Sequence, residues 1–181
     1  MRIYLDIDGV LADFVGATAK LHDFDPAVVT QWDYYPLIGM KESTFWDGVR
    51  DAGKHFWKYI QPYGWMSELF DECRRRGQVT LLTAPPPRTD CRAAMVQGRI
   101  DWIHYWFGDD FRDYFVGCRK ELLAAPDTVL IDDSDSNCLK FAAAGGRTIL
   151  FPQPWNNNRA ISERVRYAVE CLPHLPGSEV A

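Results

Sequence analysis

Two aspartates stand where the first apolar run of the chain ends. Residues 3–14 read IYLDIDGVLADF, so Asp6 and Asp8 come two positions apart, directly before Gly9. Carboxylates at such a point can serve as a nucleophile, as a general acid and base, or as ligands for a hard cation. The spacing directs both side chains toward one side of a strand, and the glycine permits a sharp turn after them. In isolation, the same pattern is more commonly a strand end with an Asx turn.

Four further apolar runs lie along the chain, and two of the strong ones end at polar residues. Runs rich in β-branched and aliphatic residues lie at 2–7, 79–83, 128–132 and 147–151, with a weaker candidate at 113–118. Because they lack polar alternation, they are predicted to be strands covered on both faces. After the first, the strong runs end at Thr83, at the pair Asp132 and Asp133, and at Pro152.

Helical patterns separate these runs, at residues 67–76, 89–107, 136–144 and 161–172. The first three are each followed by a glycine: Gly77, Gly108 and Gly145. A glycine in this position predicts a left-handed cap. Strand and helix in alternation predict an α/β fold, a doubly wound parallel sheet of about five strands with helices on both faces.

Residues 15–62 interrupt the alternation. They are rich in tryptophan and tyrosine, contain scattered Pro and Gly, and show no convincing strand. They are predicted to form a small helical cap inserted after strand one, over a catalytic core made of residues 1–14 and 63–181. Most of the aromatic side chains in and next to this insertion are expected to form its own core: Trp32, Tyr34, Tyr35, Phe45, Trp46, Phe56, Trp57 and Trp65. The tail from Pro173 is expected to fray.

The carboxyl ends of parallel strands share one edge of a sheet, which is where ligands bind in such folds. Asp6, Asp8 and Asp132 would therefore gather there, and their charges would repel one another in a poorly solvated site. A hard cation such as Mg²⁺ relieves this repulsion, takes one or two carboxylates and accepts phosphate oxygens. The residue types thus favour a Mg²⁺ site.

These residues resemble the motifs of the haloacid dehalogenase (HAD) superfamily of phosphatases. Its Asp-x-Asp-Gly motif at the end of strand one is matched by DIDGVLADF, and its Thr or Ser at a strand end by Thr83 in VTLLTAP. The superfamily also has a lysine ahead of its last motif, and Lys120 in GCRKELL matches it. The last motif, an acidic pair, is matched by LIDDSDSN. The resemblance covers about residues 1–13 and 63–155. Within the superfamily, the chain looks most like the 5'(3')-deoxyribonucleotidase group. This finer resemblance is carried by DGVLADF, the FW segments, IDD and LFPQPWN.

The resemblance implies a mechanism that the residue types can support. Asp6 would attack phosphorus and form an aspartyl phosphate, and Asp8 would protonate the leaving oxygen and later take a proton from water. Thr83, the backbone N–H groups after it and Lys120 would hold the phosphoryl oxygens. Ala84 stands where close relatives often have a hydroxyl residue, so the N–H groups must suffice there. Arg119 is the alternative to Lys120.

The resemblance also implies the metal ligands. Mg²⁺ would be bound by the Asp6 carboxylate, the main-chain carbonyl of Asp8 and Asp132, which leaves the Asp8 carboxyl free for proton transfer. Asp133 would orient waters or Lys120 from outside the ligand set. Asp132 and Asp133 could instead cap the following helix, although Ser134 and Asp135 can also do so.

The expected activity is dephosphorylation of (deoxy)ribonucleoside monophosphates, with Phe14 first and Trp46 second as candidates for stacking on the base. The same chemistry could act on another small phosphomonoester, such as a sugar phosphate or a nucleotide-derived cofactor. A third interpretation is a non-catalytic phosphate or nucleotide sensor, but such a protein would be expected to lack Asp6 or Asp8, and both are present.

Composition narrows the classes of partner. The 181 residues carry a net charge of -5 and are 47% hydrophobic, which favours a single packed domain and disfavours long nucleic acids. The five cysteines lack the spacing of a zinc site or disulfide scaffold and are expected to be reduced thiols. We expect no cleaved leader, no membrane span, a cytoplasmic location and a monomer or homodimer.

Overall fold

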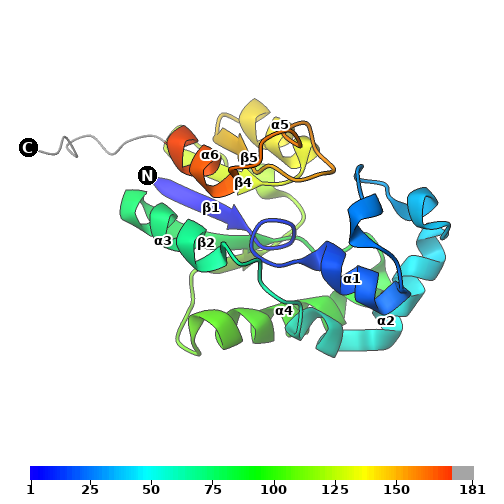
Figure 1. Ribbon diagram of the computed structural model, residues 1–181. Helices are drawn as coiled ribbons and strands as arrows, with labels where there is room; N and C mark the ends of the chain where they lie inside the picture. Colours follow the sequence, from blue (N-terminus) through cyan, green and yellow to red (C-terminus); the bar gives the residue numbers. More distant parts are fainter. Residues whose placement is uncertain (173–181) are drawn as a thin grey trace, which may run out of the picture.

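The computed structural model of the protein describes residues 1–172, so the tail from Pro173 lies outside the described residues. Five parallel strands form one sheet (Figure 1): β1 (Arg2–Asp6), β2 (Gln78–Thr83), β3 (Tyr114–Val116), β4 (Thr128–Asp132) and β5 (Arg147–Leu150). Their order, β3-β2-β1-β4-β5, is that of a doubly wound Rossmann-like sheet. The predicted α/β fold class is therefore confirmed, and the weak candidate at 113–118 is the short edge strand β3.

The strands are apolar on both sides because helices cover both faces of the sheet. Ile3 and Leu5 of β1 join the main core, to which helices α3 (Met66–Arg76) and α6 (Arg164–Cys171) contribute. Tyr4, between them, points to the other face, where it packs edge-on against Phe141 of α5 (Asp135–Ala143) at a centroid distance of 6.2 Å. This alternation explains why the sequence shows no polar face in β1.

One helix begins later than predicted. The long helix α4 (Thr89–Phe107) has the expected bounds, whereas α6 begins at Arg164 and not at Ile161. The chain before α6 is held in turns by asparagine side chains, since Asn158 Nδ2 donates to the Leu150 carbonyl at 2.7 Å. Such side-chain bonds to the backbone compete with helix formation, so the helix starts after them.

The glycines after the helices serve different purposes. Gly108 and Gly145 have φ angles of 97° and 93°, a region that favours glycine. Gly77 has φ -178°, so the predicted left-handed cap is wrong there. A Cβ at Gly77 would lie 2.5 Å from the Met1 carbonyl oxygen, which shows that this glycine instead allows the chain to pass close to the first residue.

The segment between β1 and α3 is helical, as expected. It contains α1 (Phe14–His22), the short 3-10 helices η1 (Pro26–Val28) and η2 (Tyr35–Ile38), and α2 (Glu42–Lys58), and no strand is assigned in residues 15–62. Figure 1 shows α1 and α2 beyond the carboxyl end of β1. We refer to residues 15–62 as the insertion. Across residues 1–172, none of the helices has the length and apolar character needed to span a bilayer.

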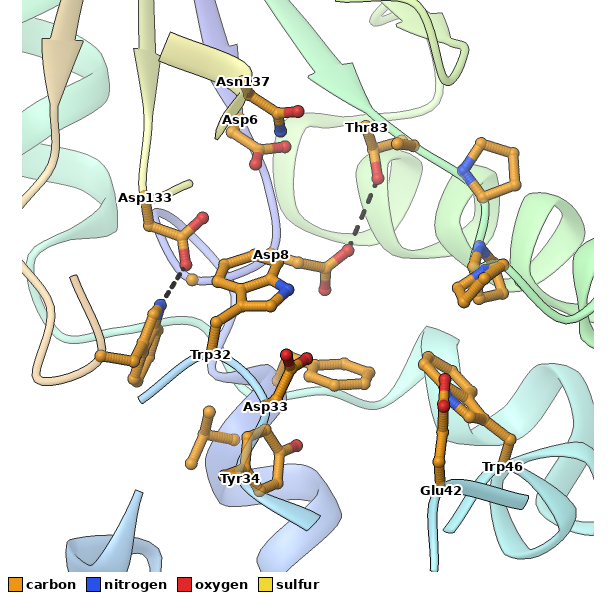
Figure 2. A pocket seen from close by; sticks show the side chains of 18 of the residues that line it. Asp6, Asp8, Trp32, Asp33, Tyr34, Glu42, Trp46, Thr83, Asp133 and Asn137 are labelled. Carbon is orange, nitrogen blue, oxygen red and sulfur yellow. Dashed lines mark hydrogen bonds between the residues drawn. The ribbon is translucent and has the colours of Figure 1, made fainter. Parts of the chain in front are cut away.

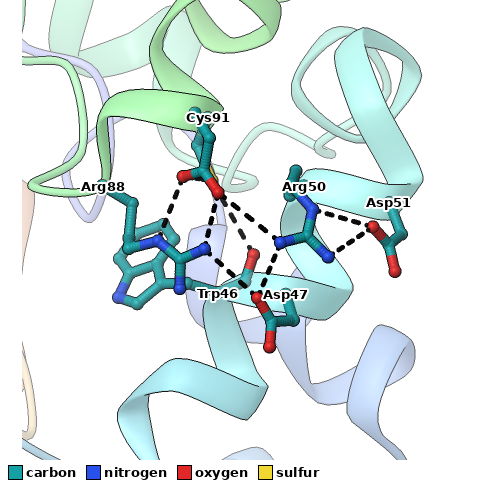
Figure 3. Close-up of polar contacts among 7 residues, drawn as sticks. Trp46, Asp47, Arg50, Asp51, Arg88 and Cys91 are labelled. Atoms are coloured by element: carbon teal, nitrogen blue, oxygen red, sulfur yellow. Dashed lines mark hydrogen bonds and ion pairs between the residues drawn. The ribbon is translucent and has the colours of Figure 1, made fainter.

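The insertion is attached to the core through a close contact between α2 and α4. A Cβ at Gly98 of α4 would lie 2.3 Å from the Lys54 carbonyl oxygen of α2, so the two backbones touch. A surface network adds to this contact (Figure 3): Arg50 and Arg88 both pair with Asp47 and Asp90. Helix α2 is kinked at Gly53, where φ is 62°.

Candidate active site

A pocket of about 340 Å³ opens at the carboxyl edge of the sheet, under the insertion (Figure 2). Its floor is made by residues from four separate parts of the chain: Asp6, Asp8, Thr83, Lys120 and Asp133. Its opposite wall is largely aromatic: Phe14, Trp32, Tyr34, Tyr35, Trp46 and Trp57. The doubly wound topology thus brings the polar strand ends together, as the sequence pattern predicts.

Asp6 is the last residue of β1 and is buried. Its Oδ1 accepts a hydrogen bond from the Ile7 N–H at 2.8 Å and pairs with Lys120 Nζ at 2.7 Å. Burial, reinforced by the charge of Asp132, raises the pKa of Asp6 to about 8, although Lys120 opposes the shift. The rigid strand end therefore holds this carboxylate in place at the floor of the pocket.

Lys120 occupies the predicted position in the site. It begins the 3-10 helix η3 (Lys120–Leu123), is 3% exposed, and its Nζ lies 2.7 Å from oxygens of both Asp6 and Asp132. Burial alone would lower the pKa of Lys120, but the two carboxylates outweigh it and raise the pKa. The neighbouring Arg119 is exposed and pairs with Glu121, so the lysine, and not the arginine, faces the site.

Asp132 ends β4 and is fully buried. Its carboxylate accepts hydrogen bonds from the Ser134 N–H at 2.9 Å and from Asn137 Nδ2 at 3.2 Å, in addition to the Lys120 contact. The cap of α5 is Ser134, whose Oγ accepts from the Asn137 N–H. Asp132 and Asp133 are therefore not the N-cap of this helix, and Asp132 is held facing Asp6.

Three buried carboxylates form one cluster. Asp6, Asp132 and Asp133 each offer an oxygen, and these oxygens lie within 4.8 Å of one another. Burial and the charge of Asp132 raise the pKa of Asp133 well above its usual range. Lys120 is the sole lysine or arginine among the described residues lining the pocket, and one ammonium cannot balance three carboxylates. An all-oxygen cluster with excess negative charge fits a hard divalent cation, and Asp133 lies close enough to share in binding it.

Asp8 is held by a residue that the sequence analysis did not identify. Arg99, in the middle of α4, donates from Nη2 to Asp8 Oδ1 and forms a salt bridge with it. A buried guanidinium therefore occupies one oxygen of the Asp8 carboxyl, the group expected to carry out proton transfer. The other oxygen, Oδ2, faces the Thr83 hydroxyl at 3.5 Å (Figure 2).

Thr83 ends β2, is almost completely buried, and lines the pocket beside Ala84. The next three residues are prolines, which have no N–H. The backbone donors expected after the threonine are consequently reduced to the Ala84 N–H. Any phosphoryl oxygen bound on this side of the pocket has the Thr83 hydroxyl and that single N–H available.

Gly9 is required by both conformation and space. Its φ is 78°, and a Cβ there would lie 2.0 Å from Asp133 Oδ2. We expect Gly9→Ala to lower the free energy of unfolding by at least about 1–3 kcal/mol and to reduce any activity, because Asp133 must move. Gly39→Ala is the matched control, since Gly39 has φ 65° but open space around it. Equal effects of the two substitutions in urea unfolding would contradict a specific contact with Asp133.

The two candidates for base stacking both line the pocket. Phe14 stacks on Trp57 at a centroid distance of 5.6 Å and tilts against Trp46 at 6.3 Å. Trp46 is buried, and its Nε1 donates to Tyr35 Oη. Trp32 was expected in the core of the insertion but is 56% exposed and lines the pocket.

Sequence reasoning missed three residues that shape the site. Arg99 donates to Asp8, Asn137 donates to Asp132, and Trp155 donates from Nε1 to Asp133 Oδ2 at 2.8 Å. For Arg99 a signal was present, since it lies four residues after Met95 and four before Ile103, both fully buried. A charged residue on the buried stripe of a helix indicates an ion pair inside the protein.

No protein-family model matches the chain. No curated protein matches it either. Among solved structures, it is similar to a HAD-superfamily hydrolase of subfamily IA from Geobacter sulfurreducens (14% identity, 95% of this chain and 96% of that chain, TM-score 0.49). It is also similar to L-2-haloacid dehalogenase from Xanthobacter autotrophicus (10% identity, 99% of this chain and 91% of that chain, TM-score 0.48). A third similar structure is a HAD family enzyme from Bacteroides thetaiotaomicron in complex with magnesium and inorganic phosphate (17% identity, 86% of this chain and 96% of that chain, TM-score 0.36).

Proposed function

We propose that this chain is a Mg²⁺-dependent phosphomonoesterase of the HAD superfamily that acts on (deoxy)ribonucleoside monophosphates, in the manner of a 5'(3')-deoxyribonucleotidase. One observation carries the proposal. Asp6, paired with Lys120 and next to Asp132, shares the floor of a single pocket with Asp8, and the opposite wall of that pocket is aromatic. A nucleophile, an acid–base group and an apolar surface for a base therefore lie around one cavity of suitable size.

In the first half of the reaction, a carboxylate oxygen of Asp6 attacks phosphorus while the bond from phosphorus to the ester oxygen breaks. Asp8 gives its proton to the departing oxygen, so the nucleoside leaves as a neutral alcohol. Lys120 lowers the pKa of Asp6, against burial and the charge of Asp132, and so favours the ionised form that attacks. The Thr83 hydroxyl and the Ala84 N–H donate to phosphoryl oxygens as their charge shifts.

In the second half, Asp8 removes a proton from water, and the resulting hydroxide attacks phosphorus of the aspartyl phosphate. The bond from Asp6 to phosphorus breaks, inorganic phosphate is released, and the Asp6 carboxylate is regenerated. Mg²⁺, bound through Asp6, the Asp8 carbonyl and Asp132, would supply positive charge to balance the phosphate and the carboxylates. Asp133 lies within reach of the same position.

The insertion would act as a cap that excludes water and selects the leaving group. Its aromatic wall suits a flat base, and base–aromatic stacking contributes about 1–3 kcal/mol per base. Asp33 and Glu42 also line this end of the pocket. These carboxylates would accept hydrogen bonds from a base but repel a second anionic group, which supports monophosphates over bisphosphates.

A substrate panel tests the proposal. With Mg²⁺, kcat/KM for nucleoside 5'- or 3'-monophosphates is expected to exceed that for glucose 6-phosphate by roughly 10-fold or more, in line with one stacking contact. Trp32→Ala should lower kcat/KM for nucleotides by a similar factor, because an exposed ring can be removed without emptying the core. Tyr59→Ala, at an exposed aromatic residue that does not line the pocket, is the control.

Two results would overturn the assignment. Turnover of the sugar phosphate without turnover of any nucleotide would favour the same chemistry on another phosphomonoester. Nucleotide binding by calorimetry, with no release of phosphate from any ester, would favour a sensor on this fold.

A further inference from the structure

Arg99 is a buried cation in an unusual setting. It lies in the middle of α4 and is fully buried, and its guanidinium carbon lies 5.6 Å from the ring centroid of Trp57 and 5.3 Å from that of Trp102. Its Nε and Nη1 have no hydrogen-bond partner within residues 1–172. Burying a charge with unsatisfied donors is unfavourable by several kcal/mol, and the neighbouring Met95 and Ile103 show that an apolar side chain could fill this stripe.

Arg99 forms its salt bridge with Asp8. Nη2 donates to Asp8 Oδ1, while Asp8 Oδ2 faces Thr83 and the pocket. A carboxyl group held at one oxygen by a rigidly packed guanidinium cannot rotate freely about its Cβ–Cγ bond. Oδ2 is thereby the oxygen presented to a bound phosphate ester.

We propose that Arg99 is the positioning residue of the acid–base group: it fixes the Asp8 carboxyl so that Oδ2, and not Oδ1, exchanges the proton with the leaving oxygen. This inference rests on the proposed phosphomonoesterase function. Arg99 itself does not line the pocket and acts through Asp8. Since Trp57 belongs to α2, the position of Asp8 also depends on the packing of the insertion.

The role predicts a dependence on the leaving group. A nucleoside or other alkoxide needs a proton to leave, whereas p-nitrophenolate leaves without one. Misplacing a general acid costs about 10²–10⁴-fold in rate for the first kind of ester. Arg99→Met is therefore expected to lower kcat about 100-fold or more for nucleoside monophosphates and less than about 10-fold for p-nitrophenyl phosphate.

The experiment measures kcat for both esters in the wild type, Arg99→Met, Arg99→Lys and Arg88→Met, with Mg²⁺ present. Arg99→Lys should recover part of the nucleotide rate, since lysine retains a donor and a positive charge. Arg88→Met, in the surface network that joins the same two helices (Figure 3), should behave like wild type with both esters. Thermal unfolding of each variant shows which ones are folded.

The outcomes separate this inference from the proposed function. If Arg99→Met is folded and loses the same factor with both esters, or if Arg99→Lys recovers nothing beyond Arg99→Met, Arg99 does not position the acid and the inference is wrong. If Arg99→Met does not fold, Arg99→Lys alone must show the larger loss with nucleotides, and an equal loss contradicts the inference. A wild type that hydrolyses neither ester contradicts the proposed function itself.

Discussion

Replacing Asp6 with asparagine is expected to reduce phosphate release from every substrate by at least about 1000-fold, because the amide cannot form the phosphoryl intermediate. The protein should remain folded, since asparagine keeps the shape of the side chain and its acceptor for the Ile7 N–H. Phosphate release under saturating substrate and Mg²⁺ measures the effect. Asp135→Asn is the control, because Asp135 bonds to Asn157 outside the carboxylate cluster.

The same substitution has a second expected effect, on stability. The pKa of Asp6 rises from an ordinary value of 3.8 to about 8 in the folded protein. A raised carboxyl pKa means that its contribution is fully present below pH 4 and is lost as the pH rises through about 8. Without divalent cations, Asp6→Asn should therefore have a higher Tm than wild type at pH 8 and a similar Tm at pH 4.

Either half of this result can be contradicted separately. An Asp6→Asn variant with a wild-type rate of phosphate release would exclude the nucleophile role. A variant that is inactive but also less stable than wild type at pH 8 would indicate a damaged fold, and its inactivity would carry no mechanistic meaning.

Removal of divalent cations is expected to abolish activity and to lower the Tm of the folded protein at pH 8. At 100 times its dissociation constant, a ligand of the folded state adds about 2.7 kcal/mol, which corresponds to roughly 5–10 °C for a chain of this size. Because Asp6, Asp132 and Asp133 bind a cation only when they are ionised, the gain with Mg²⁺ should be larger at pH 8 than at pH 5.

Thermal unfolding with EDTA and with Mg²⁺ at both pH values measures this linkage. Asp132→Asn should lose most of the Mg²⁺-dependent gain, while Asp135→Asn should retain it. If Mg²⁺ raises the Tm of wild type and of Asp132→Asn equally, or raises the Tm of wild type more at pH 5 than at pH 8, Mg²⁺ binds elsewhere.

The strands of the sheet could be predicted because a strand buried on both faces appears in the sequence as an apolar run without polar alternation. The strand β4 (Thr128–Asp132) is buried at every position, and its five residues include three consecutive aliphatic ones. The place of Asp6, Thr83 and Asp132 follows from the same logic, since the carboxyl ends of parallel strands share one edge. Local pattern and topology together were sufficient for these residues.

Features that depend on one long-range contact could not be predicted in the same way. Arg99 and Asp8 are 91 positions apart, and nothing near either residue specifies the other. Gly77 was interpreted as a left-handed cap because it follows a helical pattern, yet its role is set by Met1, which precedes the neighbouring strand β1. Trp32 was expected in the core because its type is usually buried, but burial depends on what covers it.

The contact between Gly98 and the Lys54 carbonyl limits how a substrate can enter. Since the backbones of α2 and α4 touch at this point, moving the two helices apart would break a close-packed contact. Entry and exit should therefore depend on the shorter stretch between α1 and α2, which carries η1, η2 and the exposed Trp32. Helix α2 would then stay packed on α4 while the segment between α1 and α2 moves. The rate of product release would be set by that segment of about twenty residues.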